Sequence, residues 1–300
     1  VVVTVLLLTE LKHTFTEFAQ RMKNDEMITL AKFLAISDII LPMLPHKNLI
    51  PDINLTPYSI WLATVVVSGI SYLSYLLKRY VFHESGVLVS GIIGGLYSST
   101  ATISVLARKS RKASAQEANE YVAAMLLAVS MMFLRFMILI LIFSREIFMS
   151  IYPYLLIMSV VAAVVAWFIH SRQRRSKDLS ADSEEEDSSN PLEFKVALIF
   201  ATLFVIFTVL THYTLVYAGT GGLNLLSFVS GLSDITPFIL NLLQNTGSVA
   251  VLIVVACSMQ AIISNILVNM FYGLFLAGKV SKLRPLILGG FGTVIGVNLV

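Results

Sequence analysis

Polar residues interrupt two apolar stretches of this sequence, and they are of the kinds that bind small ions. In the first stretch, GGLYSSTATIS, they follow the pair Gly94 and Gly95. In the second, SGLSDITPF, they precede Pro237, and glycine and proline both interrupt helices. Hydroxyl, carboxylate and free carbonyl oxygens at a broken helix bind small ions. The sequence therefore predicts an ion path lined by Ser98, Ser99, Thr100, Thr102, Ser233, Asp234 and Thr236.

Arg135 lies near the centre of the apolar stretch Tyr121 to Phe143, between MMFL and FMIL. A central arginine costs about 2.5–3.5 kcal/mol to insert into a membrane, so we expect it to face the protein interior and to have a partner. Asp234 is the candidate partner. The pair is either structural, or it makes Arg135 an anion site or a barrier against cations.

Three further polar residues stand inside apolar stretches. Asn265 and Asn269 are four residues apart and so share one helix face. They either join helices by hydrogen bonds or line the ion path beside Asp234. Asp38 is a secondary candidate. It is either a proton or cation site or a buried carboxylate that has its hydrogen-bond partners.

Composition places all of these residues in a membrane. Hydrophobic residues make up 57% of the 300 residues and charged residues 13%, where soluble domains carry about 25% charged residues. The net charge of +3 is too small to indicate nucleic acid. Nucleotide motifs, nucleophile elbows and catalytic carboxylate pairs are missing from the sequence, so we expect neither an enzyme nor a cofactor. The histidines have no zinc-ligand spacing, and any metal stays unknown: His13, His46, His83, His170 and His212.

Nine apolar segments could form helices of membrane-spanning type. A basic, then acidic and serine-rich stretch, 171–190, divides them and predicts a disordered cytoplasmic linker. The chain opens inside a hydrophobic segment, so Val1 to Thr9 is expected to end a longer span. The nine segments are Ile28–Leu44, Ser59–Leu77, Gly86–Ala107, Tyr121–Phe143, Tyr154–Ile169, Val196–Val216, Leu223–Leu243, Val249–Leu276 and Pro285–Val300.

Basic residues orient these segments, because cytoplasmic loops collect Lys and Arg. If Gly86–Ala107 crossed the membrane fully, the cluster Arg108 to Lys112 and the linker would both face outside. A segment that dips in and returns to the same side places both clusters in the cytoplasm, together with Lys279 to Arg284. Glycine and serine at membrane depth suit such a re-entrant segment, since irregular backbone there must be buried in protein or line a wet cavity.

The second half of the chain repeats this order of segments. Ser230-Gly231 echoes Ser90-Gly91, and Pro153 and Pro285 are each expected to open a closing span. The predicted fold is an all-α polytopic membrane protein with inverted repeats, each of three transmembrane helices plus one re-entrant broken helix, and extra N-terminal helices. The predicted domains are N-terminal helices (1–56), repeat one (57–170), the linker (171–190) and inverted repeat two (191–300).

Five motifs resemble a known family: GGLYSSTATISVLARKS, AVSMMFLRFMILILI, NPLEFKVALIFATLFV, SGLSDITPF and ISNILVNMFYG. They resemble the membrane domain of unknown function that lies C-terminal to an MgtC/SapB-type domain, and the resemblance covers most of the chain from about Leu30. It implies a multi-pass protein of the bacterial inner membrane that is associated with magnesium homeostasis, and it implies no particular substrate. Residues 1–56 would then hold the end of a truncated MgtC-like part.

Two classes of function follow from these patterns. The first is a channel or secondary transporter for a small ion, with a cation, including a divalent one such as magnesium, slightly favoured over an anion bound by Arg135. The second is a non-transporting membrane scaffold or regulatory partner. The expected partners are the ion, the lipid bilayer and a second copy of the chain, because Gly289, Gly290, Gly292 and Gly296 allow close approach of two helices.

Overall fold

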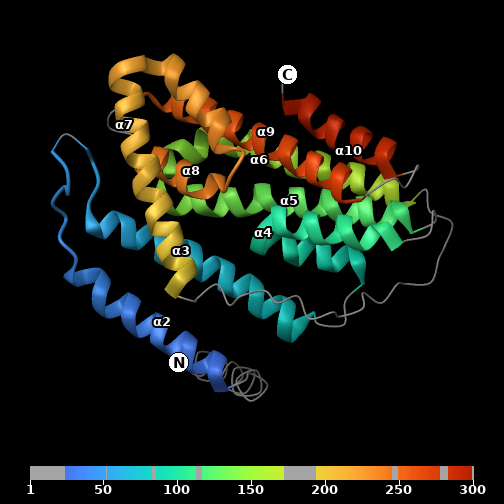
Figure 1. Ribbon diagram of the computed structural model, residues 1–300, viewed down its shortest axis with the longest axis horizontal. Coiled ribbons are helices and arrows are strands. Elements are labelled where there is room, and N and C mark those ends of the chain that lie inside the picture. The colour runs from blue at the N-terminus through green and yellow to red at the C-terminus, as the bar shows by residue number, and fades with distance from the viewer. Residues whose placement is uncertain are drawn as a thin grey trace, which may run out of the picture.

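The described part of the protein is almost entirely helical (Figure 1). The computed structural model describes residues 24–51, 53–82, 86–112, 117–171, 194–244, 249–277 and 283–298. The predicted linker beyond Ser171, and the start of the chain with its expected span end, lie outside the described residues. The main helices are α2 (Asn24–Met43), α3 (Pro57–Leu76), α4 (Val87–Lys109), α5 (Ala118–Phe143), α6 (Arg145–Ser171), α7 (Phe194–Ser230), α8 (Ile235–Gln244), α9 (Val251–Leu276) and α10 (Leu283–Asn298).

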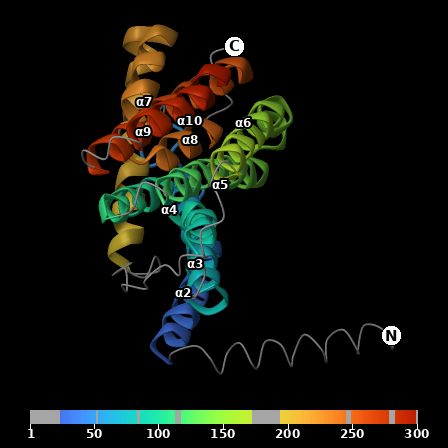
Figure 2. The same ribbon diagram turned by 90° about the vertical axis from the view of Figure 1, so that its right-hand side faces the viewer.

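Among the described residues, six helices are long and apolar enough to cross a membrane when α4 and α7 are each counted as one helix across the non-helical residue inside them: α3 with its short π-helical extension, α4, α5, α6, α7 and α9. The protein is therefore of the multi-pass, all-helical membrane class that the composition predicts. α2, whose 20 residues are all described, is not one of the six. It lies alongside α3 in Figure 1, and Figure 2 shows this pair projecting away from α6 and α10.

One predicted boundary is wrong. Pro153 was expected to open a span, but α6 already begins at Arg145 and Pro153 lies inside it. The reason is that Ile147 and Ile151, which precede the proline, are fully buried and hold this part of the helix against the core. Only Ser144 separates α5 from α6, and the two helices then pack together through hydrogen bonds between Ser130 and Ser159.

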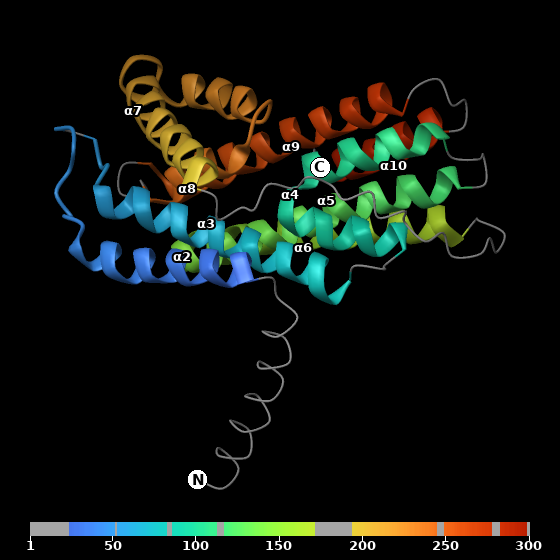
Figure 3. The ribbon, with the colours of Figure 1, turned by 60° about the horizontal axis from the view of Figure 1, so that its bottom comes forward.

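α4 folds back on itself at Ser98, whose backbone is extended (φ −157°, ψ 106°). A Cβ atom added to Gly94 would lie 2.5 Å from Oγ1 of Thr102. A continuous helix would separate these two residues by about 12 Å along its axis, so the halves 87–97 and 99–109 are neighbours. They lie side by side in Figure 1 and Figure 3, and we call them the α4 hairpin.

The N-terminal half of the α4 hairpin packs against α5 through its glycines. A Cβ on Gly91 would collide with the backbone of Ala124, and one on Gly95 would lie 2.5 Å from Cα of Ala128. The two contacts advance together along both helices, so this half runs parallel to α5. The hairpin therefore begins and ends at the end of the molecule where α5 begins.

α7 also reverses direction, at Gly219 (φ 58°, ψ −151°). Glycine is required there because this region of backbone angles is essentially closed to other residues. The chain then forms a second pair of half-helices, 220–230 and α8, separated by the break 231–234. We call this pair the α7–α8 hairpin. The reversal is visible at the top of α7 in Figure 1 and Figure 3.

The two hairpins open toward opposite ends of α3. Gln244, the last residue of α8, donates from Nε2 to the carbonyl oxygen of Ser59 (3.4 Å) in the first turn of α3. The α4 hairpin begins shortly after the other end of α3. The side chain of Arg111, which follows this hairpin, donates to the carbonyl of Leu276 at the end of α9.

α5 lies at the centre of the packing and contacts α4, α6, α8 and α10. Of the glycines in α10, Gly290 packs against Leu126 of α5. Gly289, Gly292 and Gly296 have open space where a Cβ would stand. The predicted homodimer stays a prediction, and these three glycines are the ones not used within the chain.

A single methyl group tests the packing of the α4 hairpin. Gly91→Ala should destabilise the protein by about 1–3 kcal/mol, because the new Cβ meets the backbone of Ala124, which cannot move away locally. Gly69→Ala is the matched control, since nothing lies within 4 Å of its Cβ position in α3. Thermal unfolding in one mild detergent measures both. Equal melting temperatures for the two variants would contradict the close packing of α4 on α5.

Candidate functional site

The breaks in the two hairpins line one cavity of about 530 Å³. Its walls also include α3, α5, the first part of α7 and α9. Most of the residues predicted to form an ion path lie around it: Ser98, Ser99, Thr100, Arg135, Ser233, Asp234, Thr236 and Asn265. Residues far apart in the sequence are thus brought together at one place between the hairpins.

Three predicted residues lie elsewhere. Thr102 packs against Gly94 within the α4 hairpin. Asn269 is fully buried and donates from Nδ2 to Oδ1 of Asn265 (3.1 Å), so it supports a lining residue without lining the cavity itself. Asp38 is exposed on α2, which contradicts the expectation of a buried carboxylate. Among the described helices α2 packs against α3, and Asp38 is not covered by this contact.

Arg135 holds the break in the α4 hairpin. Its Nη1 donates to the carbonyl oxygen of Tyr97 (2.8 Å), the last residue before the break. The carbonyls at a helix C-terminus have no partner within the helix and carry partial negative charge, which a guanidinium stabilises. The Nε atom of Arg135 is buried and has no hydrogen-bond partner among the described residues.

Asn265 does the same for the break in the α7–α8 hairpin. Its Nδ2 donates to the carbonyl oxygens of Gly231 (3.2 Å) and Ser233 (3.4 Å). The carbonyl oxygen of Phe228, one turn before Gly231, accepts from Oγ of Ser264, the residue before Asn265 (2.7 Å). α9 thus supplies partners for the freed carbonyls of the second break, as α5 does for the first.

A capping side chain starts the second half-helix of each hairpin. The backbone N–H of Ala101 donates to Oγ of Ser98 (3.4 Å), and the backbone N–H of Thr236 donates to Oδ1 of Asp234 (3.0 Å). Serine and aspartate are both preferred at this position, where a side-chain oxygen satisfies an N–H that the helix leaves free. Both half-helices therefore begin at the cavity.

Arg135 and Asp234 face the cavity without touching each other. Both are described, and no ion pair within 4 Å joins them. The predicted close pair is therefore not formed, because each side chain is held by its own break, Arg135 at Tyr97 and Asp234 at Thr236. Two opposite charges lie across one cavity.

Two residues that line the cavity and a buried asparagine that joins α8 to α7 were not identified from the sequence. Ser68 and Ser71 of α3 line the cavity, and their spacing of three residues on one helix face is a signal that could have revealed them. Asn241 of α8 is fully buried, and its Nδ2 donates to Oγ1 of Thr211 (2.7 Å) and the carbonyl of Phe207 (3.3 Å). It fixes α8 to the first part of α7.

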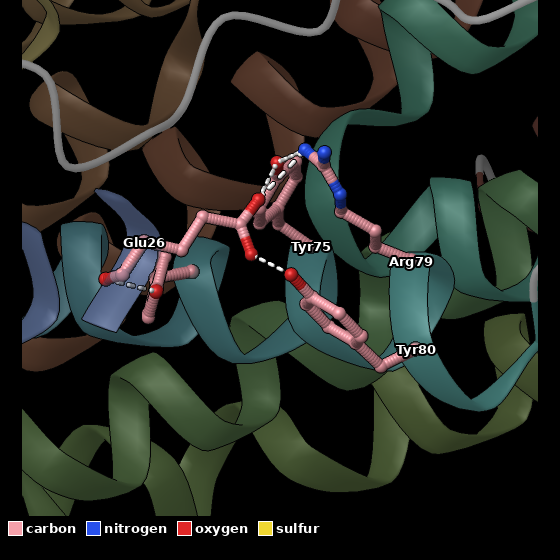
Figure 4. Close-up of polar contacts among 5 residues, drawn as sticks. Glu26, Tyr75, Arg79 and Tyr80 are labelled. Atoms are coloured by element: carbon pink, nitrogen blue, oxygen red, sulfur yellow. Dashed lines mark hydrogen bonds and ion pairs between the residues drawn. The ribbon is translucent and has the colours of Figure 1, made fainter. Parts of the chain in front are cut away.

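A second polar cluster, which sequence reasoning also missed, joins α2 to α3 (Figure 4). Glu26 of α2 is buried, and its Oε1 accepts from the Tyr75 hydroxyl (2.8 Å) and pairs with Nη1 of Arg79 (2.7 Å). Its other oxygen accepts from the Tyr80 hydroxyl. Tyr97, next to the α4 break, packs against the buried group of Tyr72, Tyr75 and Leu76. This cluster therefore connects α2 to a wall of the cavity.

Removing one partner tests this cluster. Arg79→Met should destabilise the protein by about 1–2 kcal/mol, a value reduced for the partial exposure of Arg79, because it leaves the buried Glu26 carboxylate without its counter-charge. Glu26→Gln should cost less, since an amide of the same shape still accepts from Tyr75. Urea unfolding of the protein in detergent micelles compares the two. A larger loss in Glu26→Gln would show that the ion pair is not what holds the cluster.

Comparison with known proteins finds similarity over the part of the chain that forms the cavity. A family described as Domain of unknown function (DUF4010) matches residues 65–277, a range that contains both hairpins and every lining residue of the cavity. An uncharacterized protein of Aquifex aeolicus (strain VF5) is 24% identical over 215 residues, which are 71% of this chain and 92% of that protein.

No solved structure matches the chain. Neither similarity carries an MgtC/SapB name, so that association stays an expectation of the sequence. The family match covers well over half of the chain. The protein is therefore a member of this family of unknown function.

Proposed function

We propose that the protein is a membrane channel or secondary transporter that moves a small charged solute through the cavity between the two hairpins. One observation carries the proposal: both breaks, with a cation and a carboxylate, line a single cavity of about 530 Å³. A scaffold that needed only packing would gain nothing from polar groups there. Irregular backbone inside a membrane is tolerated where it is buried in protein or lines a water-filled space.

The lengths of the half-helices support re-entrant segments. Each half of the α4 hairpin, 87–97 and 99–109, extends only about 16 Å at about 1.5 Å per residue. The hydrocarbon core of a bilayer is about 30 Å thick, so neither half crosses it. Both ends of this hairpin lie at one end of the molecule, next to the basic cluster Arg108 to Lys112. That arrangement suits a segment that enters from the cytoplasm and returns.

Equivalent contacts support an inverted repeat. Gly95 packs on Ala128 and Gly231 on Ser264, at the same separation in sequence. Gly95 and Gly231 each stand three residues before the capping residue of their hairpin. Gly231 therefore corresponds to Gly95 rather than to Gly91, with which the sequence motifs align it. The hairpins open in opposite directions, as inverted repeats around a central binding site do.

The charges on the cavity wall favour neither sign of ion. At about 6 Å and an effective dielectric constant of about 20, one unit charge contributes about 3 kcal/mol. A monatomic cation would gain this from Asp234 and lose a similar amount to Arg135, and an anion would do the reverse. The slight preference for a cation that the sequence suggests has no further support from the geometry.

Solute flux tests the proposal. Protein in liposomes should release or take up at least one of Na⁺, Mg²⁺, Cl⁻ and small dipolar organic solutes, measured with ion-sensitive dyes and radiolabels. Asp234→Asn should change the rate or selectivity of that flux, and Asp38→Asn should not, because Asp38 is exposed on α2 away from the cavity. Absence of flux for the whole panel from correctly folded protein would favour the scaffold instead.

Accessibility of single cysteines tests the arrangement in the membrane. The one native cysteine, Cys257, is fully buried and contributes little background. Lys47→Cys and Arg111→Cys replace exposed residues, one in the loop before α3 and one after the α4 hairpin. A membrane-impermeant maleimide should label Lys47→Cys in intact cells, but Arg111→Cys only after permeabilisation. Labelling of both from outside would mean that α4 crosses the membrane.

A further inference from the structure

The charges that line the cavity are arranged as a complementary pair rather than as a site for one sign. Among the described lining residues, Arg135 and Asp234 are the ones with a basic and an acidic side chain. They come from different halves of the chain, α5 and the α7–α8 hairpin. Because no ion pair within 4 Å joins them, each keeps part of its charge unmatched by the other.

The Arg135 wall has hydrogen-bond donors to spare. Nη1 is occupied by the Tyr97 carbonyl, whereas the buried Nε has no partner among the residues that the structure describes. The half-helix 99–109 begins beside it, and its capping bond from Ala101 to Ser98 is long at 3.4 Å. A guanidinium edge and free N–H groups at a helix start both favour a carboxylate.

The part of the cavity wall around Asp234 offers hydrogen-bond acceptors instead of donors. Asp234 is exposed and lines the cavity, and Oδ1 accepts from the Thr236 N–H while Oδ2 makes no hydrogen bond to the described part of the chain. The hydroxyl of Ser233 lines the cavity beside it. A carboxylate with an oxygen to spare and a neighbouring hydroxyl suit an ammonium group.

The size and the remaining walls suit an organic solute. A volume of about 530 Å³ falls in the range of about 300–1,000 Å³ typical of small-molecule sites and exceeds what a monatomic ion needs. Apolar side chains also line the cavity, among them Val67, Phe136, Phe200 and Leu203. These can contact a short carbon side chain.

From these observations we infer that the solute is a small zwitterion of the amino-acid class, with its carboxylate on Arg135 at the α4 break and its ammonium group on Asp234 at the α8 break. A dipolar solute gains from both walls, whereas a monatomic ion of either sign meets one like charge. This inference rests on the proposed function only for the movement of the solute. Binding alone tests the site.

Binding is measured on the purified full chain in detergent and nanodiscs, with radiolabelled glycine, alanine, serine, β-alanine and γ-aminobutyrate as probes. At least one should bind saturably. Its amide, which lacks the carboxylate, and its N-acetyl derivative, which lacks the ammonium group, should each bind about 10- to 100-fold more weakly, as expected for loss of a hydrogen bond to a charged group.

Two variants that each remove one charge give the sharpest control. Asp234→Asn keeps a good helix cap, whereas Arg135→Gln places its amide on a shorter side chain than the guanidinium that donates to Tyr97, so thermal unfolding in detergent first checks that each variant is folded. Each should lose zwitterion binding. Arg135→Gln should discriminate less against the amide, and Asp234→Asn less against the N-acetyl acid. The matched control Asp38→Asn should bind like the unchanged protein.

The outcomes separate the two proposals. Zwitterion binding without uptake into liposomes would leave the site in place and overturn transport. Flux of Na⁺, Mg²⁺ or Cl⁻ with no binding of any zwitterion would overturn this inference and leave transport in place. Binding that is equally strong for a zwitterion, its amide and its N-acetyl derivative would also overturn it.

Discussion

The structure depends on satisfying backbone carbonyls where two helices are broken inside an apolar protein. A buried carbonyl without a partner costs about 1–3 kcal/mol, and each break frees several. Arg135 supplies the partner for Tyr97 at one break, and Asn265 supplies partners for Gly231 and Ser233 at the other. Both donors stand on the long helix that follows their hairpin, so the packing of α5 and α9 fixes where the breaks lie.

The same constraint explains why polar groups gather on the cavity wall. A half-helix that ends at a break needs donors, and the half-helix that starts there needs an acceptor such as Ser98 or Asp234. Two breaks that meet therefore gather donors and acceptors in one place. Removal of either Arg135 or Asp234 would also leave the other charge less balanced, which couples the stability of the breaks to the charge of the cavity.

The sequence predicts much of this arrangement because charged residues, which are costly to bury in a membrane, are rare in its apolar stretches. Arg135 and Asp234 are recognisable as single charged residues in apolar stretches, and both line the cavity. The break near Ser98 follows from its glycines and the basic cluster after it. Asp38 was equally conspicuous, yet it is exposed, because sequence alone does not reveal which residues of α2 its contact with α3 covers.

Other features depend on contacts that no local pattern encodes. Glu26 precedes its apolar stretch and looks like an ordinary surface residue until α3 brings two tyrosines and Arg79 to it. Pro153 looks like the start of a helix until buried residues before it hold the helix together. The sequence could not show whether Arg135 and Asp234 form a close pair. The answer depends on whether each side chain hydrogen-bonds the backbone at its own break instead of the other side chain.

The central claim is that the two breaks line one wet cavity, and backbone hydrogen exchange in nanodiscs tests it most directly. Mass spectrometry of peptides that cover 98–101 and 233–236 should show exchange within minutes, because water reaches amides that no long helix protects. The central part of α5 should stay protected for hours. Protection of both breaks equal to that of α5 would contradict the claim.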